Sequence, residues 1–158
     1  ITYIHTDKDG WTYLASVEDL YSRKIIGWAF GKTMDAELAK KALKNASLNV
    51  KKTKGIILQT DLGSQYTSNI FEEYLAELKI LHSYSRKGCP YDNSCIESFH
   101  SILKKEEVNL KKYKDFKDAY NAIFEFIEAW YNRERIHSSL NYRTPDEVYS
   151  NLEKSLVA

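Results

Sequence analysis

The chain has 158 residues, of which 43% are hydrophobic and 28% are charged, and its formal net charge is +1. This length and composition indicate a single folded domain over residues 1–158 and exclude a disordered chain. No apolar run approaches the ~18 residues of a membrane span, and the first residues are not a signal peptide. The sequence contains only two cysteines, Cys89 and Cys95, which excludes a disulfide scaffold and favours a reducing, cytoplasmic setting.

The first third of the sequence predicts an antiparallel meander of three strands. Asp9-Gly10 is a hairpin signal, because this pair tolerates the positive φ angles that tight turns require. Tyr21 to Arg23 predicts a second turn. The runs between these turns are rich in β-branched, aromatic and small apolar residues, and the predicted strands are residues 1–6, 11–17 and 24–30.

Beyond this meander, helical and strand patterns alternate. Ser68 or Asn69 suits the N-cap of one helix, and Pro145 suits the first turn of the last helix with Thr144 as its N-cap. The predicted elements are a helix at 35–49, a strand at 55–60, a helix around 70–78, a strand at 80–84, a loop at 85–93, a helix from Asn93 or Ser94 past Lys104, a longer helix from Phe116 to Trp130 and a last short helix.

This order of elements predicts the fold class. Hairpins come first and βαβ units follow, which indicates an α/β fold built on a mixed five-stranded sheet with helices on both faces. Residues from about 115 to 158 would be a helical C-terminal extension of the same domain, since no linker or repeat divides the chain.

Two acidic residues occupy positions where chemistry is common. Asp61 ends a buried strand, and ligand sites of open α/β sheets gather outside the carboxyl ends of strands, although an ordinary turn aspartate fits this position equally well. Glu97 lies in the first turns of a helix, where the helix dipole alone favours a carboxylate. Lys104 lies about two helical turns further on and would share the face of Glu97, where a cation suits a phosphate-bearing substrate and a solvated lysine is the simpler explanation.

Several segments together resemble a known family. DLGSQYTS at 61–68 resembles the second-aspartate motif of insertion-sequence transposases, and PYDN at 90–93 with ESF at 97–99 and LKKE at 103–106 resembles their glutamate motif. Residues 19–28 resemble the preceding strand–turn–strand block, and the motifs around 131–145 resemble the C-terminal signature. In this way the chain is similar, along essentially its whole length, to the retroviral-integrase-like catalytic core of transposases encoded by two-frame insertion sequences.

The resemblance implies a ribonuclease-H-like fold and an Asp, Asp, Glu triad that binds two Mg²⁺ or Mn²⁺ ions. It makes Asp61 the second aspartate and Glu97 the glutamate, and the 35 residues between them match the family's own spacing. The family's first aspartate immediately precedes the block that begins here at Ile1, so it has no position in this sequence, and Asp7, Asp9 and Asp19 do not replace it. We therefore expect this fragment, which also lacks the helix-turn-helix region upstream, to bind metal weakly and to show little or no strand transfer.

The resemblance further implies DNA transposition by phosphodiester cleavage and strand transfer. The expected partners are transposon ends and target DNA, and the expected assembly is a homo-oligomer at the bacterial nucleoid. Lys104 matches a basic family position that meets the DNA end. The candidate DNA-binding residues are Lys104, Arg86, Lys87, Gln65 and Asn93, and Gln65 and Asn93 could instead brace the metal-binding loop.

Other functions fit parts of the sequence. Arg133, Arg135, His137 and Tyr142 superficially offer the residue set of a tyrosine recombinase, although the spacing is wrong for that class. A non-enzymatic DNA-binding or dimerisation module and a same-fold metal nuclease also remain open. A zinc site is conceivable in which Cys89 and Cys95 are ligands and His82 or His100 completes the set. The spacing of these residues does not form a zinc pattern.

Overall fold

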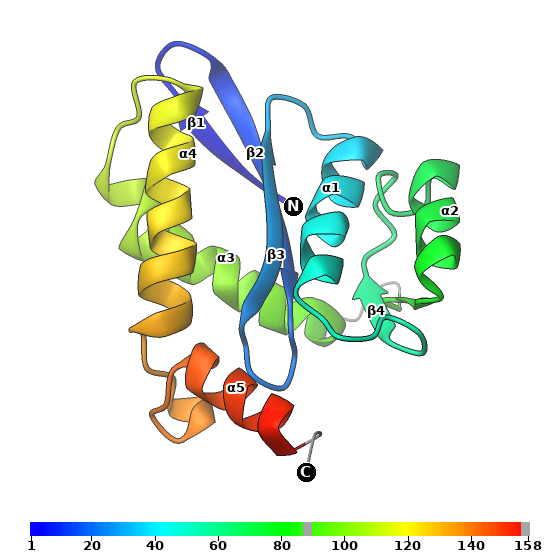
Figure 1. Cartoon of the computed structure of the whole chain (residues 1–158). Coiled ribbons are helices and arrows are strands. Elements are labelled where there is room, and N and C mark those ends of the chain that lie inside the picture. The colour runs from blue at the N-terminus through cyan, green and yellow to red at the C-terminus, as the bar shows by residue number, and fades with distance from the viewer. Residues whose placement is uncertain (87–89, 156–158) are drawn as a thin grey trace.

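The computed structural model describes residues 1–86 and 90–155, in which five strands combine with helices on both sides (Figure 1). The strands are β1 (Thr2–Thr6), β2 (Gly10–Glu18), β3 (Ile25–Gly31), β4 (Ile57–Thr60) and β5 (Leu81–Tyr84). The helices are α1 (Ala36–Leu48), α2 (Asn69–Leu78), α3 (Ser94–Glu106), α4 (Phe116–Phe124) and α5 (Pro145–Ser155), with short helical turns η1 (Pro90–Asn93), η2 (Val108–Leu110), η3 (Glu125–Tyr131) and η4 (Ser138–Leu140).

The first three strands form the predicted antiparallel meander, and each boundary lies within one residue of the prediction. The β1–β2 hairpin closes where Thr6 pairs with Gly10, whose φ of +71° is a conformation that glycine adopts without strain. The β2–β3 register shifts after Val17, which pairs with Gly27, because Glu18 pairs with Ile25; Ile26 is therefore an extra residue in β3, a bulge.

Three asparagine side chains bond to the backbone of β3, the outer strand of this sheet. The Asn132 amide accepts a hydrogen bond from Ile25 N and donates one to Ile25 O, both at 3.0 Å, across a sequence separation of 107 residues. Asn45 on α1 and Asn49 just after it each donate to a carbonyl oxygen of β3 at 2.8 Å. These bonds attach both α1 and the C-terminal helices to the edge of the sheet.

The last two strands do not join the meander. β4 and β5 pair in parallel from Ile57 opposite Leu81 to Thr60 opposite Tyr84, and within residues 1–86 and 90–155 the five strands form a three-stranded and a two-stranded sheet. The single five-stranded sheet of the prediction is therefore divided. The two sheets are separated by a cavity. β4 is held by packing of Leu58 against α2 instead of by pairing with the meander.

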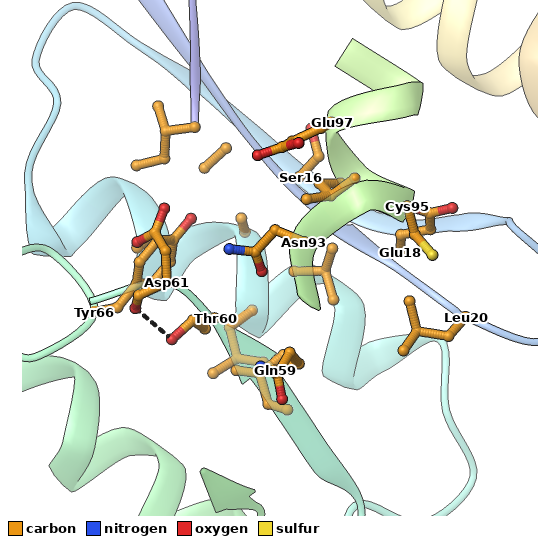
Figure 2. A pocket seen from close by; sticks show the side chains of 18 of the residues that line it. Ser16, Glu18, Leu20, Gln59, Thr60, Asp61, Tyr66, Asn93, Cys95 and Glu97 are labelled. Atoms are coloured by element: carbon orange, nitrogen blue, oxygen red, sulfur yellow. Dashed lines mark hydrogen bonds between the residues drawn. The ribbon is translucent and has the colours of Figure 1, made fainter. Parts of the chain in front are cut away.

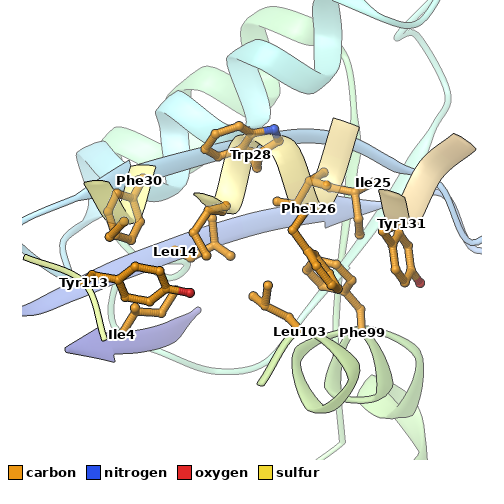
Figure 3. Close-up of a cluster of buried hydrophobic side chains, with 13 residues drawn as sticks. Ile4, Leu14, Ile25, Trp28, Phe30, Phe99, Leu103, Tyr113, Phe126 and Tyr131 are labelled. Carbon is orange, nitrogen blue, oxygen red and sulfur yellow. The ribbon is translucent and has the colours of Figure 1, made fainter. Parts of the chain in front are cut away.

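Helices cover both faces of the meander, as predicted. α3, α4 and η3 bury one face in a large cluster that contains Leu14, Phe99 and Ile127, each fully buried (Figure 3). On the opposite face α1 packs Leu38 and Ala42 against small residues of β2 and β3. A third cluster joins α1 to α2 and so carries the two-stranded sheet.

Helix ends follow the capping residues that the sequence predicts. Ser68 Oγ accepts a hydrogen bond from Phe71 N at 3.3 Å at the start of α2. At α5, Thr144 Oγ1 accepts from Glu147 N at 3.2 Å and Glu147 Oε2 accepts from Thr144 N at 2.9 Å, a reciprocal capping box. No helix in the described part of the chain is both long and apolar enough to cross a membrane.

Candidate active site

A cavity of about 250 Å³ lies between β2, β4, α1 and the start of α3 (Figure 2). Asp61 and Glu97 both line it, from the end of β4 and from the first turns of α3, and both side chains are exposed to solvent. Ile1 and Asn93 line the same space. The structure thus brings together the two carboxylates that the sequence singles out, from segments separated by 35 residues.

The loop after β4 fixes the Asp61 carboxylate. Asp61 Oδ1 accepts a hydrogen bond from Gly63 N at 2.8 Å. A Cβ atom on Gly63 would lie 2.8 Å from Asp61 Oδ1 and 2.5 Å from Gln65 Nε2, so only glycine leaves both side chains in place. The Gln65 side chain therefore lies close to Gly63 within this loop.

Ser85 connects the two walls of the cavity. Its hydroxyl lies 3.0 Å from the carbonyl oxygen of Thr60, the residue before Asp61, and 2.9 Å from Asn93 Oδ1 at the start of α3. Its backbone N–H also donates to Thr60 O at 2.7 Å. Asn93 thereby braces the glutamate-bearing helix against β4. The sequence-based prediction did not include Ser85. Its position just after a strand could have indicated it, because neighbouring parallel strands end side by side.

A second support lies behind the end of β4. His82 Nε2 lies 2.8 Å from Thr60 Oγ1, and His82 Nδ1 lies 2.6 Å from Glu72 Oε1 on α2. The Tyr84 hydroxyl also donates to Glu72, and this hydrogen bond holds the pKa of Glu72 below its usual value. These contacts fix the strand end that carries Asp61. They also engage the imidazole of His82, which the zinc hypothesis would use.

Two ionisable side chains that line the cavity beside the two carboxylates, His100 and Tyr66, have shifted pKa values. Burial lowers the pKa of His100, which lies one helical turn beyond Glu97 in the same cavity, to about 3, so its imidazole is uncharged at neutral pH. Burial, reinforced by the nearby Asp61, raises the pKa of the Tyr66 hydroxyl above its usual value. Asp61 and Glu97 thus share the cavity with an imidazole and a phenol that carry no charge at neutral pH.

Two segments of the sequence, residues 1–90 and 78–145, match the integrase core domain family. The chain belongs to this family. A sequence relative is the transposase for insertion sequence element IS904 of Lactococcus lactis, which is 40% identical over 147 residues. That alignment covers 93% of this chain and 58% of the relative, so the chain spans less than two thirds of the relative's length.

Solved structures of integrase cores share the fold. The catalytic core domain of BIV integrase superimposes with a TM-score of 0.67 at 17% identity and covers 99% of this chain and 95% of that chain. The HTLV-2 integrase catalytic core domain in complex with magnesium gives a TM-score of 0.65 at 18% identity, with coverage of 93% and 90%. These similarities confirm the ribonuclease-H-like fold that the sequence resemblance implies.

The candidate DNA-binding residues of this integrase core have different surroundings. Lys104 Nζ lies 4.3 Å from the centroid of the Tyr3 ring, a cation–π contact at the edge of β1. Arg86, whose side chain is 79% exposed, lies 3.5 Å from Asp92 Oδ2 through its Nε, and its backbone N–H bonds to the same oxygen. Lys87 lies outside the described residues, so the structure gives no position for it.

The rival residue sets are not assembled. Arg135 forms a 2.8 Å ion pair with Glu106, and Arg133 lies 3.7 Å from Asp146. His137 packs edge-on against a buried tyrosine. Arg133, Arg135 and His137 therefore have separate side-chain partners, and Tyr142 is linked to His137 only through a backbone hydrogen bond of 2.9 Å, from Tyr142 N to His137 O. Across residues 1–86 and 90–155 no group of three or more His, Cys, Asp and Glu side chains is arranged to hold a metal, which disfavours zinc; Cys89 lies outside this part.

Proposed function

We propose that this chain is the catalytic core of a DNA transposase, in which Asp61 and Glu97 bind divalent metal ions and so direct phosphodiester cleavage and strand transfer. The supporting observation is that these two carboxylates, from β4 and α3, line one cavity in an integrase core. A magnesium complex of the HTLV-2 core shows that this fold can carry the ion. DNA at the bacterial nucleoid would be the substrate, and a homo-oligomer the acting form.

The residues of the cavity fit a hard divalent ion. Mg²⁺ and Mn²⁺ prefer oxygen ligands, which the carboxylates of Asp61 and Glu97 and the amide of Asn93 can supply. When bound there, such ions would activate the attacking oxygen and stabilise the leaving oxygen. Gly63 and Ser85 hold the two ligand-bearing segments in position, and Lys104 supplies a charge for a DNA phosphate.

In the proposed reaction, water first attacks a phosphodiester at a transposon end and exposes a 3′-hydroxyl. That hydroxyl then attacks a second phosphodiester, and each displaced oxygen leaves with its own strand. No protein–DNA covalent bond forms, so no side-chain nucleophile is needed. The chain's own contribution is to orient the phosphate and to present Asp61 and Glu97 to the same cavity.

A third acidic residue would complete this site. The family's first aspartate precedes the segment that begins here at Ile1, and Ile1 lines the cavity. We propose that a carboxylate at that preceding position shares the metal ions with Asp61 and Glu97. Two carboxylates bind the pair more weakly than three, so the 158-residue chain should bind metal weakly and transfer strands little or not at all.

Mn²⁺ titration of the 158-residue chain, followed by electron paramagnetic resonance, tests the metal site. We expect Asp61→Asn and Glu97→Gln each to weaken Mn²⁺ binding about tenfold, whereas Glu125→Gln, on an exposed position of η3, should leave it unchanged. The same titration on a chain extended by one aspartate before Ile1 should show tighter binding and EDTA-sensitive DNA cleavage. An extension by asparagine is the matched control.

A second candidate function is a DNA-binding or dimerisation module without catalysis. The observation that favours it is the absence of a third acidic ligand beside Asp61 and Glu97 among the described residues. The titration separates the two functions. Unchanged Mn²⁺ binding by Asp61→Asn would make this aspartate structural and favour the second function, and strong strand transfer by the 158-residue chain would contradict the need for a third carboxylate.

A further inference from the structure

Aromatic side chains gather on the outer face of the β1–β2 hairpin. In β1, burial alternates residue by residue, so that Tyr3 and His5 point outward while Ile4 is buried. Trp11 on β2 lies directly opposite His5 and points to the same side. Tyr3 and Trp11 are each 55% exposed, which is unusual for two large aromatic rings at the centre of a hairpin.

The three rings are in mutual contact but remain uncovered. Trp11 meets Tyr3 at a centroid distance of 5.3 Å and an angle of 90°, and it meets His5 at 5.1 Å and 78°. Cross-strand aromatic contacts of this kind stabilise a hairpin and explain how the rings orient one another. They do not explain the exposure, which arises because the cluster under α1 covers this face over Ala15 and Ala29, with Ile1, Tyr13 and Val17 beside them, and does not include Tyr3, His5 or Trp11.

The aromatic face begins at the cavity. Ile1 lines the cavity, and a strand rises about 3.3 Å per residue, so Tyr3 lies ~7 Å and His5 ~13 Å further along β1. Lys104, on the same helix as Glu97, places its ammonium group 4.3 Å from the Tyr3 ring. A row of rings with a cation at its near end therefore leads away from Asp61 and Glu97.

The charges around the hairpin suit an anionic ligand. The hairpin's turn carries two acidic residues, Asp7 and Asp9; Asp7 is exposed, whereas Asp9 is paired with Lys32 at 2.7 Å and accepts a hydrogen bond from Phe116 N at 2.7 Å. Its charge is therefore compensated. Lys104 remains directed at the aromatic face, where an approaching phosphate would find it.

We propose that Tyr3, His5 and Trp11 form a stacking platform for unpaired bases of the DNA strand whose phosphodiester reaches the cavity. Lys104 binds a phosphate of that strand at the near end of the platform. Every base has a π-face, so stacking of this kind tolerates any sequence and adds affinity beyond the backbone contacts. The inference rests on the proposed function, because the cavity is what places the strand beside β1.

Fluorescence quenching tests the platform without catalysis. The probe is an eight-nucleotide single-stranded DNA with one 2-aminopurine base, titrated with the full 158-residue chain in EDTA. The native chain and Trp11→Phe should quench the probe, whereas Trp11→Ala should bind about tenfold more weakly and quench little. Trp130→Ala is the matched control, because Trp130 is also an exposed tryptophan, at 44%, but lies on η3.

A blunt duplex of the same sequence provides the second arm. Trp11→Ala should bind this duplex as the native chain does, because paired bases do not reach the platform. The proposal is overturned if Trp11→Ala binds the single strand like the native chain, or if it weakens the single strand and the duplex equally. Unchanged Mn²⁺ binding by Asp61→Asn, together with retained stacking, would instead defeat the proposed function and leave the platform standing.

Discussion

The two walls of the cavity hold their carboxylates in different ways. At the β4 wall, Asp61 accepts a hydrogen bond from Gly63 N, and the strand end before it is bonded to Ser85 and His82. At the α3 wall, no hydrogen bond or ion pair among the described residues holds the Glu97 side chain. The position of the Asp61 carboxylate is thus fixed by its own loop, whereas that of the Glu97 carboxylate depends on the position of α3.

The largest expected effect concerns a third carboxyl, Glu18, which lines the same cavity between these walls but has a side chain only 3% exposed. Burial raises the pKa of Glu18 to about 7, Arg23 opposes this rise and Asp19 adds to it. The folded state therefore holds the proton more tightly than the unfolded state, whose pKa is the ordinary 4.5. The stability from this group is complete below pH 4.5 and is lost as the pH rises to about 7.

Glu18→Gln removes this dependence. At pH 9 the variant should be more stable than the native chain by about 3 kcal/mol, and at pH 4 the two should be equal. Urea denaturation at several pH values measures the difference, with Glu125→Gln as an exposed control. Parallel stability curves for the native chain and Glu18→Gln would show that the buried carboxyl is not the titrating group.

The next effect breaks the local support of Asp61. Gly63→Ala places a methyl group 2.8 Å from Asp61 Oδ1 and should displace the carboxylate. We expect Mn²⁺ affinity to fall about tenfold with little change in melting temperature, because the loop is exposed and the substituted residue lies outside the core. Ser64→Ala, the neighbouring position, is the control. Unchanged Mn²⁺ affinity in Gly63→Ala would mean that the loop does not position the ligand.

A smaller effect is expected when the link between the two walls of the cavity, made by Ser85, is removed. Ser85→Ala removes the hydroxyl that lies between Thr60 O and Asn93 Oδ1, and it should lower the free energy of unfolding by about 1 kcal/mol. Because no hydrogen bond or ion pair within residues 1–86 and 90–155 holds the Glu97 side chain, its contribution to Mn²⁺ binding should fall as well. Ser83→Ala on the same strand is the control, measured by the same urea denaturation and Mn²⁺ titration. Equal behaviour of the two variants would remove Ser85 from the site.

The smallest effect concerns the DNA rather than the metal. Lys104→Ala should reduce the slope of log affinity against log salt by about 1, since one phosphate contact is lost. Duplex DNA binding at several salt concentrations measures this slope, and Lys44→Ala, an exposed lysine on α1, should leave it unchanged. A slope in Lys104→Ala equal to that of the native chain would assign this lysine to the Tyr3 contact alone.

The sequence predicts local structure better than the relation between elements. Ser68 and Thr144 cap their helices as predicted, because capping depends on neighbours within three residues. The division of the sheet and the link through Ser85 depend on how β4 lies against β1 and α3, which no short-range pattern encodes. For the candidate site, the sequence predicts that Asp61 lies at the end of a strand and Glu97 at the start of a helix. The contacts that support these two segments become visible only in the three-dimensional structure.

The asparagine contacts on β3 have a consequence for how the molecule avoids aggregation. An outer strand with unpaired N–H and C=O groups can recruit a strand from another molecule and start intermolecular growth. Here the amides of Asn132, Asn45 and Asn49 take several of those backbone groups, as a neighbouring strand would. Copies of the protein are thereby kept from pairing edge to edge through this strand.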